Sequence, residues 1–171
     1  MGKADKKDLL RFMKPFPPDM QARALWLRDF VWDMYPTSNE LIYDNYNALA
    51  FGWSITDRLG HVFCTMAMGR TSGNLHFGFY YGAALSDPEK LLIGKGNQYR
   101  YLLVHDLKKF PAGYIKKLIK EAYAHSLGKL KDKSALVSGK TITKSISHSK
   151  RILARKTKSE SSGKPKKKVK K

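Results

Sequence analysis

The chain has 171 residues, with 33 Lys and Arg against 14 Asp and Glu, and a formal net charge of +19. Residues 128–171 hold sixteen of the basic residues and two of the acidic ones, so this part carries +14 and residues 1–127 carry +5. Every Trp, Tyr and Phe lies before residue 128. This distribution excludes a uniformly charged domain and predicts a globular body followed by a disordered basic tail.

Several classes of protein are disfavoured. No stretch approaches the roughly 18 uninterrupted apolar residues of a membrane-spanning helix, and residues 1–10 lack the apolar segment of a signal peptide. The single cysteine, Cys64, cannot form an intramolecular disulfide, and its strand-like neighbours predict a small buried residue. We expect a cytoplasmic protein, or a nuclear one if the host is eukaryotic, since residues 164–171 resemble a basic nuclear-import signal.

Residues 1–15 are predicted to be a charged lead-in to the domain, which spans residues 16–127. A first helix is expected from Pro18 to just before Pro36, because apolar residues recur between them at helical spacing. Five strand-like segments follow. They cover residues 41–46, 49–56, 62–68, 75–81 and 98–104.

The short connections between the first four strands favour antiparallel hairpins. A short helix over residues 86–92 is predicted after them, with Ser86 or Asp87 as its cap, and a closing helix over residues 111–127. The predicted fold class is therefore α+β: a small antiparallel sheet flanked by N- and C-terminal helices, with a disordered basic tail. In the tail, residues 141–155 either form a basic amphipathic helix or are disordered.

The stretch LLIGKGNQYRYL at residues 91–102, with Asp-Pro-Glu at 87–89, resembles the signature of the YdhG-like family, a family of unknown function. The segment at residues 43–49 resembles one of its subgroups, and the likeness extends over most of residues 16–125. It implies a small antiparallel sheet flanked by helices. One bacterial branch of the family is described as a frataxin-like iron chaperone, so the resemblance makes iron a possible ligand.

Iron would need hard oxygen ligands gathered on a surface. Asp29 and Asp33 lie one turn apart on the first predicted helix, and Glu40 and Asp44 follow shortly after. These four residues are the candidate metal ligands. The alternative is a solvated helix face whose acids are paired with Arg or Lys.

Polar and aromatic residues suggest a cleft close to the first helix. They either line that cleft or stitch the fold together by hydrogen bonds. The candidates are Tyr43, Asp44, Tyr46, Asn47, His76 and Tyr80.

A second candidate site is the turn around Gly94 and Gly96. The two glycines allow backbone amides to be exposed beside Lys95 and Arg100, an arrangement that suits phosphate or carboxylate. The alternative is a tight turn in which Arg100 is ion-paired.

The basic tail predicts sequence-independent binding of nucleic acid or another polyanion, because Lys and Arg release counterions from phosphates without reading bases. A solubilising arm is the alternative. The residues concerned are Lys150, Arg151, Arg155, Lys156, Lys164, Lys166, Lys167, Lys168, Lys170 and Lys171.

No P-loop, paired zinc ligands or nucleophile with a base is visible, and no catalytic residue is predicted. The sequence thus predicts a non-enzymatic YdhG-like module that binds a small anionic ligand or a protein partner, with a tail that binds polyanions. A frataxin-like iron chaperone is the alternative.

Overall fold

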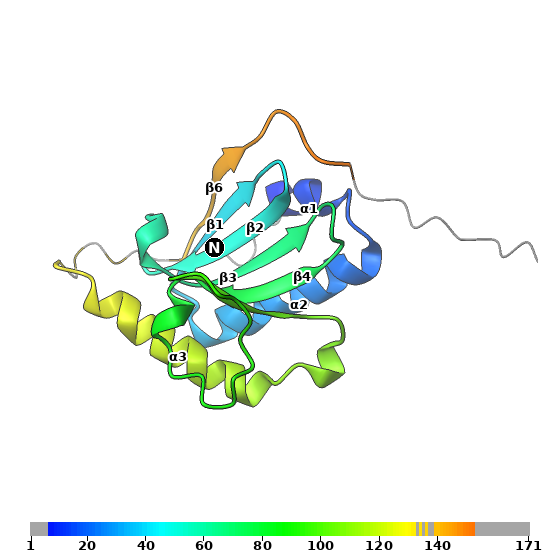
Figure 1. Ribbon diagram of the computed structural model, residues 1–171. Helices are drawn as coiled ribbons and strands as arrows, with labels where there is room; N and C mark the ends of the chain where they lie inside the picture. The colour runs from blue at the N-terminus through cyan, green and yellow to red at the C-terminus, as the bar shows by residue number, and fades with distance from the viewer. Residues whose placement is uncertain (1–6, 133, 135, 137–138, 153–171) are drawn as a thin grey trace, which may run out of the picture.

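A six-stranded sheet in the order β5-β4-β3-β2-β1-β6 organises the protein (Figure 1). The computed structural model describes residues 7–152, except for 133, 135, 137 and 138. The strands are β1 (Asn39–Asp44), β2 (Ala48–Ser54), β3 (Val62–Gly69), β4 (Leu75–Phe79), β5 (Arg100–Leu103) and β6 (Thr141–Ile146).

The first five strands form an antiparallel meander, which the short connections predicted for the first four of them. Successive side chains of a strand point to opposite faces, and in β2 the large residues Leu49, Phe51 and Trp53 all belong to the buried core. Between them lie Ala50 and Gly52, which face the other side of the sheet. One face is thus filled by bulky apolar side chains and the other is lined by small ones.

Three helices cover the bulky face: α1 (Lys7–Met13), α2 (Pro18–Met34) and α3 (Ala112–Gly128). Helices α2 and α3 lie along the sheet and pack on its central strands (Figure 1). Helix α2 begins with Pro18 in its first turn, beside Asp19, as predicted. Single-turn 3₁₀ helices also lie in the connections, among them η1 (Leu59–His61), η2 (Gly82–Ala84) and η3 (Leu107–Lys109). The α+β class is confirmed.

The interpretation of residues 1–15 as a simple lead-in is wrong for α1. This helix buries Leu9, Phe12 and Met13 in the core. Their spacing of three and four residues places them on one helix face, and apolar burial on that face holds the helix against the domain.

The helix predicted over residues 86–92 does not form. Asp87 and Lys90 have φ angles of 30° and 52°, in the left-handed region that interrupts a helix. The Asp87 carboxylate instead accepts hydrogen bonds from the backbone N–H groups of Leu91 and Leu92, at 3.1 Å each. The segment is therefore an irregular loop, joined to β5 by a bridge between Ile93 and Tyr101.

The predicted start of an unstructured tail at residue 128 is also wrong for residues 141–146. They form β6, which pairs in parallel with β1 and makes the sheet mixed. The alternative of an amphipathic helix over residues 141–155 is wrong for residues 141–146 for the same reason. Residues 153–171 lie outside the described part of the chain. No helix among the described residues is long and apolar enough to cross a membrane.

A candidate ligand-binding site on the open face of the sheet

The face of the sheet that the helices leave free contains a hollow of about 420 Å³. Its floor consists of small or short side chains on the central strands, among them Ala50, Gly52, Thr65 and Ala67. These residues alternate along β2 and β3 with the core residues. The volume lies within the range typical of sites for small molecules.

The walls of the hollow are aromatic and come from distant parts of the chain. Tyr43 stands on β1, His76 on β4, and Tyr80 and Tyr99 begin and end the long connection between β4 and β5. Leu59 of η1, which is 44% exposed, closes one end. The fold thus brings together three predicted site residues, Tyr43, His76 and Tyr80. The expected position of the cleft close to the first helix is wrong, because the hollow lies on the face that the helices leave free and no residue of α2 lines it.

Tyr99 is fixed in place by the strands beneath it. The hydroxyl of Thr65 donates a hydrogen bond to the Tyr99 Oη atom at 3.2 Å. The ring lies so close over Gly78 that a Cβ at this position would collide with it. The absence of a side chain at Gly78 of β4 therefore leaves the space that the Tyr99 ring occupies.

His76 is a flat, uncharged part of the wall. Its ring stacks on Tyr101 with centroids 4.4 Å apart and an angle of 4° between the planes. Burial lowers the pKa of His76, since a charged imidazole loses hydration there. The neutral ring is therefore the form expected near pH 7.

Two tyrosines of the wall, Tyr43 and Tyr99, also favour their neutral forms. Burial raises the pKa of Tyr43, and the neighbouring Tyr80 adds to the shift. Burial likewise raises the pKa of Tyr99, although the hydrogen bond from Thr65 acts in the opposite direction. No Asp, Glu, Lys or Arg is among the described residues that line the hollow. Its chemistry suits an uncharged ring better than an anion.

The turn around Gly94 and Gly96 is arranged differently from an anion site. The Arg100 guanidinium donates hydrogen bonds to the carbonyl oxygens of Gly96, at 2.5 Å, and Tyr99, at 2.9 Å. Gly94 has a φ of +134°, which favours glycine, and Lys95 is exposed. Arg100 thus holds a tight turn, as the alternative predicted. Its partners among the described residues are backbone carbonyls, however, and not the carboxylate of an ion pair.

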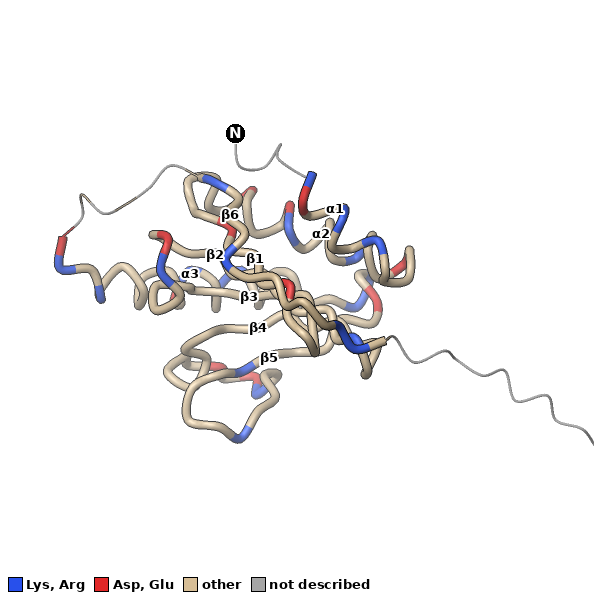
Figure 2. The backbone as a smooth tube through the Cα atoms, turned by 90° about the horizontal axis from the view of Figure 1, so that it is seen from above, with Lys and Arg blue, Asp and Glu red and all other residues tan. Residues whose placement is uncertain are grey.

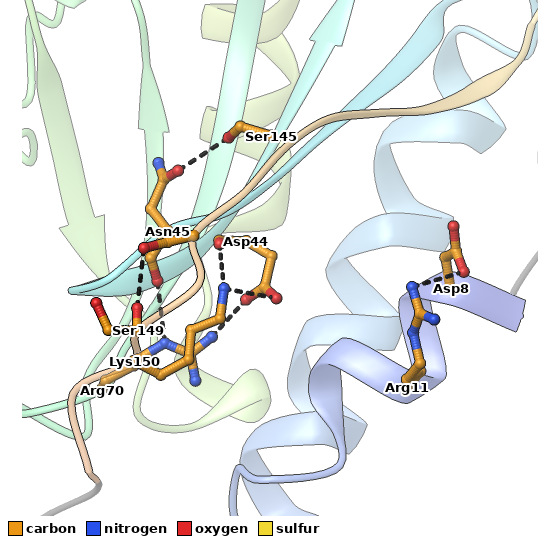
Figure 3. Close-up of polar contacts among 9 residues, drawn as sticks. Asp8, Arg11, Asp44, Asn45, Arg70, Ser145, Ser149 and Lys150 are labelled. Atoms are coloured by element: carbon orange, nitrogen blue, oxygen red, sulfur yellow. Dashed lines mark hydrogen bonds and ion pairs between the residues drawn. The ribbon is translucent and has the colours of Figure 1, made fainter.

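Asp44 does not line the hollow, and its side chain points toward Arg70 and Lys150 (Figure 3). Its carboxylate lies 2.5 Å from Arg70 Nη2 and 2.8 Å from Lys150 Nζ, and all but about 5% of the residue is buried. Ser145 of β6 donates a hydrogen bond to the Asn45 side chain, at 2.9 Å. These contacts fasten the C-terminal segment to the end of β1.

Tyr46 and Asn47 occupy the tip of the β1–β2 hairpin, outside the hollow. The guanidinium of Arg151 lies 5.5 Å from the centre of the Tyr46 ring, and the carbonyl of Asn47 accepts a hydrogen bond from the backbone N–H of Arg70. These contacts fit the stitching alternative for both residues.

The four candidate metal ligands are not gathered at one place. Glu40 is fully buried and forms two contacts with Arg28, at 2.7 and 2.9 Å, while Asp44 is bound as described above. Asp29 and Asp33 lie on α2 and also have interaction partners. Among the described residues there is no group of three or more His, Cys, Asp or Glu side chains arranged to hold a metal ion.

Of the tail cations, Lys150 and Arg151 belong to the short basic stretch with which the described chain ends (Figure 2). The others lie outside the described residues. They are Arg155, Lys156, Lys164, Lys166, Lys167, Lys168, Lys170 and Lys171.

Sequence reasoning missed the floor of the hollow and two of its walls, Leu59 and Tyr99. The available signal was the alternation of small and large residues in β2, which indicates a sheet with one crowded face and one open face. Tyr99 had been assigned to a strand, but it lies just before β5.

No family model matches the chain, and neither a curated protein nor a solved structure matches it. The resemblance to the YdhG-like family therefore stays a prediction.

Proposed function

We propose that this protein is a non-enzymatic binding module whose open sheet face accepts a planar, largely uncharged group, either a ring of a small ligand or an aromatic side chain of a partner. The supporting observation is the hollow itself, with Tyr43, His76, Tyr80 and Tyr99 around a floor of small residues. Aromatic walls offer large contact areas and prefer to pack against other rings. A charged group of the ligand would have to lie outside the hollow.

The basic C-terminal region is the second part of the proposal. With a net charge of +19, of which +14 belongs to residues 128–171, the protein attracts polyanions over distances of about a Debye length. This attraction would raise the local concentration of an anionic partner without specifying it. The iron-carrier alternative gains no comparable support, because Glu40 and Asp44 already bind Arg28 and Arg70.

The test uses 1-anilinonaphthalene-8-sulfonate, a fluorescent probe with a naphthalene ring. We expect its emission to rise with the folded wild-type protein and to be largely lost in Ala67→Leu, which fills the floor of the hollow. Ala124→Leu, on the exposed side of α3, is the matched control and should bind the probe like the wild type. Equal binding by the folded Ala67→Leu variant, or none by the wild type, would overturn the proposal.

A further inference from the structure

Resting on the proposed function, we propose that the ligand of this face is a single-stranded nucleic acid. One unstacked base would occupy the hollow, and the phosphates on either side of it would lie on cations at the rim. The two halves of the proposed function, an aromatic hollow and an attraction to polyanions, would then serve a single ligand.

The hollow has the properties of a base-stacking site. Tyr101 covers one face of the His76 ring and does not itself line the hollow, so the other face of His76 is the one available to a ligand. Tyr43 and Tyr80 line the same hollow, so a ring that enters it can pack against both. Stacking on such side chains tolerates any sequence, because every base has a π-face.

Cations flank the hollow at two places. Arg58 directly precedes Leu59, which closes one end of the hollow. On the other side, Lys144 is the unpaired residue where the register of β1 and β6 shifts, and it directly precedes Ser145, the partner of Tyr43. Both cations are exposed and neither lines the hollow itself; Arg58 lines a neighbouring hollow, so the charges lie in water beside a hollow that stays uncharged.

The rim continues toward the end of the described chain. Beyond Tyr43 the hairpin tip presents Tyr46, which is 44% exposed, with Arg151 over its ring. An exposed aromatic ring beside a guanidinium is a second place where a base can stack and a phosphate can bind. A strand that leaves the hollow past Tyr43 would therefore meet Tyr46 and the guanidinium of Arg151.

Two acids, Asp57 and Asp132, line the neighbouring hollow with Arg58 and reduce the local positive potential there. At the other side the carboxylate of Asp44 is already bound by Arg70 and Lys150 and does not line the hollow. The charge therefore favours a polyanion that binds mainly on the β1–β6 side.

A single strand fits this arrangement better than a duplex. In a duplex each base is covered on both faces by its neighbours, whereas the hollow can stack only a base that has left them. A purely electrostatic surface would not distinguish the two in this way, and it would not need aromatic walls.

The experiment measures the fluorescence anisotropy of a labelled twelve-nucleotide oligothymidylate with the full chain. Its matched probe is an abasic oligomer with the same length and charge. We expect the thymidine oligomer to bind about tenfold more tightly, the scale of one stacked base. Ala67→Leu should remove this difference and leave the weaker, salt-dependent binding of the abasic strand, whereas Ala124→Leu should leave both affinities unchanged.

Tyr80→Ala, which removes a wall instead of filling the floor, is the second variant and should reduce the same difference. Equal affinities for the two oligomers, tighter binding of a duplex, or equally tight binding of polyglutamate would each overturn the inference. If the wild type binds the naphthalene probe but shows no preference for bases, the proposed hollow stands and the nucleic-acid ligand is wrong. If the naphthalene probe fails as well, the proposed function falls with it.

Discussion

Replacing Glu40 by Gln is expected to be among the most destabilising single changes in the described sheet. Glu40 and Arg28 are both 0% exposed and are joined by two contacts, at 2.7 and 2.9 Å. Thr141 of β6 also donates a hydrogen bond to Glu40, at 2.8 Å. Glutamine keeps the volume of the side chain but removes the charge that compensates the buried guanidinium. Breaking a buried pair in this way costs about 3–5 kcal/mol.

Equilibrium unfolding in urea measures this loss. With an m-value of roughly 1–3 kcal/mol per molar urea, the midpoint should fall by about 2 M. Glu89→Gln, at an exposed carboxylate, is the control and should change the free energy of unfolding by less than about 0.5 kcal/mol. The double variant Arg28→Met/Glu40→Met should be more stable than Glu40→Gln, because no buried charge is left. A loss below about 1 kcal/mol in Glu40→Gln would refute the reasoning.

Three further changes have defined outcomes. Lys150→Met should cost about 1 kcal/mol in urea unfolding, and less than Arg70→Met, because the Lys150 side chain is 28% exposed and that of Arg70 only 3%; the reverse order would contradict the assignment. Burial lowers the pKa of His76, so the wild type should lose unfolding free energy as the pH falls below about 6.5, until the pH has passed the pKa of the folded state. His76→Phe has no such group, and its unfolding free energy should therefore depend less on pH in this range. An unchanged slope between pH 4 and 7 would count against a half-buried neutral ring. Gly78→Ala should displace Tyr99 and weaken binding of the naphthalene probe, and unaltered binding would show that Tyr99 is not a necessary wall.

Patterns among neighbouring residues were sufficient to predict most of the helices and strands that form the body of the domain. Helix α2 and the four strands β1 to β4 follow from periodicity and turn residues, and their observed ends differ from the predicted ones by about two residues. Helix α1 was missed because the charged residues around Leu9 and Phe12 outweighed their helical spacing. Strand β6 was missed because residues 128–171 were interpreted from their overall composition and not from the local pattern within them.

The β6 segment does contain a short β-branched run, Thr141-Ile142-Thr143, which favours a strand. Its partners, however, are about a hundred residues away: Thr141 bonds Glu40, and Ser145 bonds Asn45. Such pairings depend on the assembled sheet and leave no pattern in a single sequence.

The candidate site was half predictable for a related reason. Aromatic and polar residues identified Tyr43, His76 and Tyr80, but neighbouring residues of a strand point to opposite faces. Tyr43 therefore lines the hollow, while Asp44 binds Arg70 and Lys150 on the other side. Without the register, the two residues could not be separated.

The position of β6 determines where the chain should be truncated to test the role of the basic residues after it. A chain that ends at Gly128 would lose β6 along with the cations, and with it the contacts of Thr141 to Glu40 and of Lys150 to Asp44. The contacts described above that hold β6 all lie at or before Arg151. Ending the chain at Ile152 therefore keeps these contacts and removes residues 153–171.

We expect the chain that ends at Ile152 to unfold at the wild-type urea concentration but to bind the abasic oligomer more weakly, with a smaller dependence of affinity on salt. The chain that ends at Gly128 should lose stability as well, so its weaker binding could not be assigned to charge. Since β6 lies beside β1, which carries Tyr43, it fixes the start of the basic region next to the hollow. If the chain ending at Ile152 kept the full affinity and salt dependence, the cations beyond the strand would have no part in binding, and those at the rim would have to account for it alone.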